Sequence, residues 1–337
     1  MDSQNTDDSK IIAVSPSNVY DTEKMKYLLG SAKKNNVEIE IIGLGKPFNF
    51  LSKITLLRDY LTELPTDSNP IVCFTDAYDV FYVGNLDTIK AKFLSLKSNI
   101  VWSVERYYSH QLQKDKAFYD NLSRYTKSPY KYINTGTFIG YKKNLLELMN
   151  DICVSIEDTD FVKDLTEEGW NLTDRLVDQP IISHHFVKFW NKYQIKLDTM
   201  CSIFYVPSGD WFKIDRYINK QFIVTDTRHQ TSIVHVPNKP KQEYILKKLY
   251  HTKYESDTIF FNMEYSWASD SVIFHEDGTM DAFGKGTYTI KAPHTYIATF
   301  GENEHTIVFS NGFTEFISRR TKDGMVVRGK VLWKMIN

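Results

Sequence analysis

Two aspartates three residues apart are the first side chains in this sequence that could carry out chemistry. Asp76 and Asp79 lie in the segment FTDAYD, directly after the apolar run 70–75, which predicts a buried strand. Carboxylate oxygens at the end of such a strand suit Mg²⁺ or Mn²⁺, and either ion can bridge the phosphates of a nucleotide. An acidic turn that caps the next helix is the alternative, but the strand-end position favours a metal site.

A histidine and a lysine far along the chain could complete this site. His235 ends the short apolar run of the segment SIVHVPNKPK, and Lys241 is the last residue of that segment. An imidazole can complete the coordination of a metal and favours Mn²⁺ over Mg²⁺. A lysine ammonium can neutralise a diphosphate. A lone histidine at a strand end is more often structural, so the metal hypothesis depends on its pairing with the two aspartates.

Two further polar clusters could line a ligand. Asn134 and Gly136 open the segment NTGTFIGY, where they could place amide and backbone donors beside a bound molecule. Asp178 and Gln179 stand before Pro180 at the start of a predicted helix, where Asp178 could hydrogen-bond a sugar hydroxyl or act near a reacting carbon. The simpler alternatives are a strand-entry turn for the first pair and an N-cap for Asp178.

Alternating strands and helices must position these clusters. Apolar runs predict strands at 10–15, 37–43, 70–75, 99–104 and 132–141. Helical spacing of apolar residues predicts helices at 21–35, 50–63, 86–96, 143–152 and 176–189. Shorter strands are expected near 195–197, 202–206, 222–225 and 232–236, with a basic helix at 241–251. This order indicates an α/β fold with a mostly parallel, Rossmann-like sheet, in which ligands lie beyond the carboxyl ends of the strands.

The pattern changes near the C-terminus. Glycine-containing turn signals recur about every 10 residues, as typical of short antiparallel strands, and helical stripes disappear. We therefore expect a flexible tail at 1–9, an α/β domain at 10–252, and a small all-β accessory domain at 253–337, either a sandwich or barrel-like. The aromatic residues of this last segment are expected to form its core.

Composition excludes several function classes. The 337 residues carry 41 Lys and Arg against 42 Asp and Glu, so the net charge of −1 gives no attraction to nucleic acid or to an anionic membrane. Three cysteines do not form a disulfide framework. No apolar run reaches the roughly 20 residues of a membrane span, and the polar, acidic N-terminus does not resemble a signal peptide. We expect a soluble, cytoplasmic protein.

Several of these stretches together resemble a known family. The chain is similar to the glycosyltransferase domain of the multifunctional procollagen lysyl hydroxylases and its viral relatives, which implies a metal-dependent enzyme of the GT-A fold. If the chain is viral, the expected location is the host cytoplasm or the virion. The stretches that carry the resemblance are KITLLRDYL from Lys53, IVCFTDAYDVFY from Ile71, IVWSVE from Ile100, NTGTFIGY from Asn134, Asp178-Gln179, and IVHVPNKPK from Ile233.

The resemblance implies a metal and a donor. Asp76, Asp79 and His235 would hold Mn²⁺, or alternatively Mg²⁺, against the diphosphate of a UDP-sugar. Lys241 would contact that diphosphate. The family's hydroxylase portion is absent from this sequence, so the resemblance does not imply lysyl hydroxylation.

The resemblance also implies residues for the nucleotide and the sugar. Lys53 would face the nucleotide, Tyr78 would stack near uracil or ribose, and Ser15 would lie on the uracil side. Glu105 matches an acidic position after the fourth strand. The residues that would line the donor sugar and the reaction centre are Asn134, Gly136, Asp178 and Gln179.

The expected activity is transfer of a hexose, glucose or galactose, from a UDP-sugar to a hydroxyl acceptor. The resemblance suggests a hydroxylysine-linked or other protein-bound sugar on collagen-like chains as the acceptor, and it favours retention of configuration. Two alternatives stay open: a non-catalytic glycan-binding or structural protein that kept the fold, and a sugar-nucleotide pyrophosphorylase. The sequence leaves the oligomeric state open.

Overall fold

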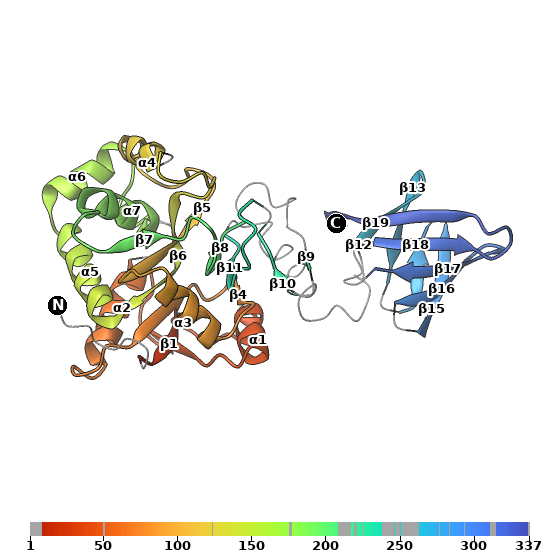
Figure 1. The fold of residues 1–337 in the computed structure, drawn as a ribbon, viewed down its shortest axis with the longest axis horizontal. Helices are drawn as coiled ribbons and strands as arrows, with labels where there is room; N and C mark the ends of the chain where they lie inside the picture. Colours follow the sequence, from red (N-terminus) through yellow and green to blue (C-terminus); the bar gives the residue numbers. More distant parts are fainter. Residues whose placement is uncertain are drawn as a thin grey trace. The chain divides into compact units, whose positions relative to one another are not determined.

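The computed structural model describes residues 9–337 except 50, 123, 175–176, 208–216, 219–220, 225, 238–245, 247–249, 251–262, 276, 283, 293, 311–314 and 336–337. The chain divides into two compact units, residues 1–246 and 247–337 (Figure 1). The first unit contains the α/β elements and the second contains only strands among its described elements. No helix of the described residues has both the length and the apolarity needed to cross a bilayer.

The first unit is built on a six-stranded sheet in the order β2-β1-β3-β6-β5-β7. Pairing is parallel between β1 and β2, between β1 and β3, and between β5 and β7. Strand β6 runs antiparallel to both of its neighbours. The predicted α/β fold with a parallel-rich sheet is therefore confirmed. The strands are β1 Ile11–Pro16, β2 Ile39–Ile42, β3 Ile71–Thr75, β5 Ile100–Glu105, β6 Tyr132–Tyr141 and β7 Ile195–Leu197.

Helices cover both faces of this sheet because its central strands are apolar on both sides. Val72 and Phe74 of β3 pack in one core cluster, while Ile71 and Cys73 pack in the other. The first cluster contains residues of α2 (Ser52–Glu63), α5 (Lys142–Ser155) and α7 (Asp178–Phe189). The second contains residues of α1 (Lys26–Lys34) and α3 (Leu86–Ser95).

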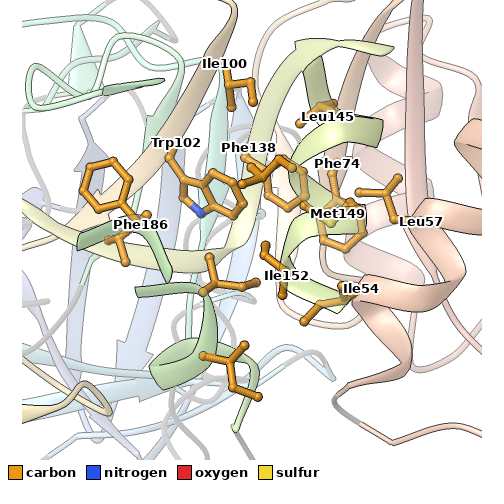
Figure 2. Packing of buried hydrophobic residues seen from close by; sticks show 14 of the residues in the cluster. Ile54, Leu57, Phe74, Ile100, Trp102, Phe138, Leu145, Met149, Ile152 and Phe186 are labelled. Atoms are coloured by element: carbon orange, nitrogen blue, oxygen red, sulfur yellow. The ribbon is translucent and has the colours of Figure 1, made fainter. Parts of the chain in front are cut away.

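Stacked aromatic rings form the centre of the first cluster (Figure 2). The ring of Phe138 lies between Trp102 and Phe74, with centroids 4.2 Å and 4.6 Å away. Leu57 of α2 and Met149 of α5 join the same cluster. Such ring pairs add about 0.5–1.5 kcal/mol each beyond the apolar area that they bury, so this stack fixes β3, β6 and β5 against one another.

A small second sheet lies beside the carboxyl end of β3 and has the order β4-β11-β8. Its strands are β4 Val80–Tyr82, β8 Phe204–Tyr205 and β11 Ile233–His235. The sequence predicts β8 and β11 but not β4. The sequence also does not predict η2 (Gln113–Asp115) or α4 (Lys116–Leu122). For the region 155–173 it predicts either a loop or a short helix, and the structure has the helix α6 (Thr159–Glu167) there. Strands β9 (Tyr217–Ile218) and β10 (Gln221–Phe222) make a separate hairpin. The predicted helix at 241–251 lies almost wholly outside the described residues.

Eight antiparallel strands of the second unit close into a barrel, because β12 pairs with both β13 and β19. The prediction of an all-β C-terminal segment is confirmed, and aromatic side chains such as Tyr265, Trp267 and Phe309 form its core. The strands are β12 Met263–Trp267, β13 Asp270–Phe274, β14 Thr279–Asp281, β15 Lys285–Ala292, β16 Thr295–Phe300, β17 Asn303–Phe309, β18 Glu315–Arg320 and β19 Val326–Met335.

Candidate functional site

Two sheets meet where the acidic cluster leaves β3. Asp76 directly follows β3, and its amide donates to the carbonyl of Gly136 in β6 at 2.8 Å. Asp79 precedes β4, which pairs antiparallel with β11 so that Val80 lies opposite His235. The amide of Val236 also donates to the Asp79 carbonyl at 2.8 Å. These backbone bonds bring the histidine beside both aspartates across more than 150 residues of sequence, as the numbering shows.

The side chains of Asp76, Asp79 and His235 converge on one point. One ligand atom from each lies within 4.8 Å of the others, and the Nε2 atom of His235 lies 3.4 Å from Asp79 Oδ2 and 3.8 Å from Asp76 Oδ2. The His235 ring is buried, and its Nε2 makes no hydrogen bond within the described part of the chain. Two carboxylates and a buried imidazole nitrogen fit Mn²⁺, because this ion accepts both oxygen and nitrogen ligands.

The protonation of these three groups is linked. Burial raises the pKa of Asp76 to about 6, although the Lys53 ammonium acts in the opposite direction. Burial also acts to raise the pKa of Asp79, but the adjacent His235 outweighs it and lowers that pKa. For His235, burial acts to lower the pKa, and the Asp79 carboxylate raises it overall. The cluster therefore favours positive charge at its centre, whether from a proton or from a cation.

Lys53 of α2 connects this cluster to a third carboxylate. Its Nζ lies 2.7 Å from Asp76 Oδ1 and 3.2 Å from Asp178 Oδ2, at the start of α7. Burial acts to lower the lysine pKa, but Asp178 and Asp76 raise it well above its usual range. The ammonium is therefore held charged among the carboxylates, and the side chain of Asp178 is an ion-pair partner rather than an N-cap.

Two amides and a glutamate form the floor of the site. The amide groups of Asn134 and Gln179 both donate to Glu105 Oε1, at 3.3 Å and 3.1 Å. Asn134 Oδ1 lies 2.8 Å from His235 Nδ1. Thr135 donates its backbone N–H to Gln179 Oε1 at 2.9 Å, and its hydroxyl lies 3.1 Å from Asp178 Oδ2. All five side chains other than the histidine come from β5, β6 and the start of α7.

Gly136 has a definite steric role. A Cβ atom on this residue would lie 2.1 Å from His235 Cε1, so the imidazole occupies the space of a side chain.

The predicted nucleotide-side residues are not all in the cluster. Ser15 is fully buried in β1, and its hydroxyl has no hydrogen-bond partner among the described residues. Tyr78 is 38% exposed, and its hydroxyl lies 2.8 Å from the Oγ of Ser17. Lys241 lies outside the described residues. The contacts described above therefore join nine of the twelve predicted positions. Ser15 and Tyr78 are set apart from this cluster, and Lys241 is not placed.

Two residues with clear roles are missing from the sequence prediction. Thr135 connects Asp178 and Gln179 to β6, and Ser17 fixes the hydroxyl of Tyr78. Thr135 lies between the predicted site residues Asn134 and Gly136, so its position in the sequence indicates that it belongs to the site. Ser17 follows the first strand at the ligand edge of the sheet, and inspection of every strand end would have included it.

Comparisons with known proteins identify the family of this chain. Residues 5–250 match the family model described as the PLOD GT domain. A procollagen-lysine,2-oxoglutarate 5-dioxygenase of Drosophila melanogaster is 29% identical over 137 residues, covering 38% of this chain and 18% of the relative. A multifunctional procollagen lysine hydroxylase and glycosyltransferase of Caenorhabditis elegans is 27% identical over 152 residues, covering 41% of this chain and 20% of the relative.

A mimivirus protein and a solved glycosyltransferase structure are also similar. An uncharacterized protein of Acanthamoeba polyphaga mimivirus is 25% identical over 217 residues, covering 60% of this chain and 41% of that protein. The crystal structure of a glycosyltransferase involved in glycosylation of the major capsid of PBCV-1 is similar over 71% of this chain and 98% of its own, with 10% identity and a TM-score of 0.40. The matches span about a fifth of the animal relatives and two fifths of the mimivirus protein. Because the family model covers most of the first unit, the chain belongs to the PLOD GT domain family of glycosyltransferases.

Proposed function

We propose that this glycosyltransferase moves a hexose, glucose or galactose, from a UDP-sugar to a hydroxyl acceptor, with Mn²⁺ held by Asp76, Asp79 and His235. The observation that carries the proposal is the convergence of these three ligand atoms, with the buried Nε2 of His235 3.4 Å from Asp79 Oδ2 and 3.8 Å from Asp76 Oδ2. When bound, the cation supplies positive charge that stabilises the diphosphate leaving group.

The chain's own residues supply the remaining positioning. Lys53 keeps a buried positive charge between Asp76 and Asp178, which limits the mutual repulsion of these carboxylates. Asp178 is held by Lys53 and by the hydroxyl of Thr135, so it is a fixed acceptor for a sugar hydroxyl. Gln179 and Asn134 are held by Glu105. A polar wall of this kind can orient a sugar before the bond to phosphate breaks.

The nucleotide would lie at the ends of β1 and β2. Exposed apolar side chains gather in the loops that follow these strands, and the amide of Gly45 donates to the carbonyl of Asn18, which joins the two loops. Tyr78 stands at the same edge through its contact with Ser17. A uracil ring could stack on such residues. The apolar side chains are Val19, Tyr20 and Leu44.

The acceptor is proposed from the family. The names of the relatives refer to procollagen lysine, so a hydroxylysine-linked or other protein-bound sugar on a collagen-like chain is the first acceptor to test. Mn²⁺ and the UDP-sugar donor are part of the same proposal.

A donor panel tests the proposal. Release of UDP from UDP-glucose, UDP-galactose and other nucleotide sugars is measured with Mn²⁺ and then with EDTA. We expect turnover of one hexose donor, its loss with EDTA, and a fall of about 100-fold or more in Asp79→Asn, equivalent to ~3 kcal/mol of lost stabilisation. Asp87→Asn is the matched control, because Asp87 is exposed in the first turn of α3.

Three outcomes would contradict the proposal. Turnover that is unchanged in EDTA would remove the metal. Glycan binding without UDP binding or turnover would favour a non-catalytic role. Formation of a nucleotide sugar from a sugar phosphate and UTP would favour a pyrophosphorylase.

A further inference from the structure

The hydrogen bonds around Asn134 determine which way its amide points. Its Oδ1 accepts the backbone N–H of Gly136 at 3.1 Å, and a backbone N–H can only donate. Its Nδ2 donates to Glu105 Oε1 at 3.3 Å. The N–H of Gly136 requires the amide oxygen on its side, and the Glu105 carboxylate requires the amide nitrogen on the other side. Both hydrogen bonds therefore fix the same orientation of the Asn134 amide. The oxygen must therefore face His235 Nδ1, which lies 2.8 Å away.

The amide of Gln179 is oriented by backbone groups as well, and it also donates to Glu105. Gln179 accepts the Thr135 backbone N–H at its Oε1 and donates from its Nε2 to the Ile133 carbonyl at 2.8 Å. The same Nε2 donates to Glu105 Oε1 at 3.1 Å. Backbone groups of β6 thus orient both amides, and both present N–H groups to one buried carboxylate oxygen. Glu105 is an acceptor in this network.

We infer that Glu105 and Asn134 form a positioning relay that keeps the proton of neutral His235 on Nδ1 and directs the Nε2 lone pair toward Asp76 and Asp79. An acceptor at 2.8 Å requires Nδ1 to be the donor, which leaves Nε2 without a proton in the neutral ring. Histidines that bind metals usually donate their other N–H to such a partner. The relay rests on the proposed metal site and gives Asn134 and Glu105 a positioning role toward His235.

The steric packing supports the same assignment. Gly136 leaves room for the ring directly against β6, and the ring is buried with little space to rotate. The carbonyl of Asn134 is held separately, by the indole N–H of Trp102 and the hydroxyl of Ser103, both at 2.9 Å. The backbone at residue 134 is therefore anchored independently of its side chain, so a side-chain change tests the relay without releasing β6.

The test uses the full chain and two measurements. Mn²⁺ affinity is read from the electron paramagnetic resonance signal of free Mn²⁺, and the His235 tautomer is read by ¹⁵N NMR of metal-free protein at a pH where the ring is neutral. We expect the proton on Nδ1 in the unaltered chain, and Mn²⁺ binding about 10–100-fold weaker in Asn134→Ala. The control Ser103→Ala removes one hydrogen bond to the Asn134 backbone, and its Mn²⁺ affinity should remain within about twofold of the unaltered chain, since Trp102 still holds that carbonyl.

The relay would be overturned by a proton on Nε2 in the unaltered chain, or by equal Mn²⁺ affinity of the unaltered chain and Asn134→Ala. Absence of Mn²⁺ binding by the unaltered chain would instead overturn the metal assignment. The NMR measurement needs no metal and no variant, so it decides the relay even in that case, or if Asn134→Ala does not fold.

Discussion

The imidazole of His235 occupies the space that a side chain on residue 136 would fill. A Cβ atom added to Gly136 would lie 2.1 Å from His235 Cε1 and 2.6 Å from each ring nitrogen. No carbon contact of that length is tolerated, so the histidine and the glycine form one structural unit. The position of the proposed metal ligand therefore depends on a residue that has no side chain.

Gly136→Ala should displace His235 while leaving β6 paired. Backbone hydrogen bonds of β6 do not involve the added methyl group, so the fold should persist. We expect Mn²⁺ affinity to fall by about 10–100-fold or more and UDP-sugar turnover to fall with it. Isothermal titration with Mn²⁺ measures the change. The control is Thr137→Ser, a buried change one residue along β6 that should leave Mn²⁺ affinity unaltered. Equal affinity in Gly136→Ala would show that His235 is not a ligand.

Lys53→Met should make the protein less stable and more responsive to Mn²⁺. Removing the ammonium leaves the buried carboxylate of Asp178 beside that of Asp76, which is 16% exposed. Loss of one member of a fully buried ion pair costs about 3–5 kcal/mol, and the partial exposure of Asp76 reduces this cost. A cation bound near Asp76 would replace part of the missing charge. We therefore expect a lower Tm without metal and a larger Mn²⁺-induced rise in Tm than in the unaltered chain.

Lys142→Met is the matched control for this experiment. Lys142 is also buried, but its Nζ donates to the backbone carbonyls of Leu64 and Pro65, at 2.9 Å and 2.8 Å. Its loss should lower Tm without changing the response to Mn²⁺. If Lys53→Met and Lys142→Met respond alike to Mn²⁺, the charge of Lys53 does not act on the metal site.

The sheet and its ligand edge could be predicted because the signals are local. Apolar runs such as 70–75 mark buried strands, and Asp76 directly follows one of them. The rule that ligands lie beyond strand ends then selects residues of several segments without any knowledge of their distances. Strand β4 has only three residues and follows an acidic turn. A segment of this length is too short to show the alternation of apolar and polar residues that predicts a strand.

The contacts within the site could not be predicted in this way. Lys53 meets Asp178 across 125 residues, and the family resemblance suggests a lysine facing the nucleotide rather than one between two carboxylates. The amide orientations of Asn134 and Gln179 depend on backbone groups of β6 that the strand pattern does not specify. Hydrogen-bond partners follow from tertiary register, whereas the sequence pattern gives only the face and the end of a strand.

Stability should fall on mild acidification because of His185 in α7. Burial lowers its pKa to about 4, against the opposing effect of Asp151, while Lys192 and Lys188 also lower it. Its Nδ1 lies 3.0 Å from the Oγ of Ser155. An unfolded histidine titrates near 6.5, so between about pH 6.5 and pH 4 the unfolded chain binds a proton that the folded chain does not. The contribution present at neutral pH is therefore lost as pH falls, by about 2 kcal/mol at about pH 5.

Urea unfolding of the unaltered chain and of His185→Gln, at several pH values between about 5 and 7, measures this contribution. We expect a smaller fall in unfolding free energy for His185→Gln over this range. Parallel pH dependence in the two proteins would mean that His185 takes up its proton equally in both states.

We propose that the barrel unit unfolds separately from the glycosyltransferase unit, and Gly329 offers a way to test this. A Cβ atom on Gly329 would lie 2.2 Å from Phe316 Cζ and 2.4 Å from the Ser266 carbonyl oxygen, so Gly329→Ala must move a core ring and a backbone group. Overpacking of this kind costs about 1–3 kcal/mol, which lowers the Tm of a unit of this size by roughly 5–15 °C. The exposed neighbour Arg328 supplies the control, Arg328→Ala.

Calorimetry should then show two transitions, of which Mn²⁺ raises one and Gly329→Ala lowers the other. UDP-sugar turnover below both transitions should be the same in Gly329→Ala, Arg328→Ala and the unaltered chain, because the proposed site lies within residues 15–241. A single transition that both Mn²⁺ and Gly329→Ala shift would mean that the two units unfold together. In that case the barrel contributes to the stability of the catalytic unit, and its loss would lower turnover at temperatures where the metal site alone should persist.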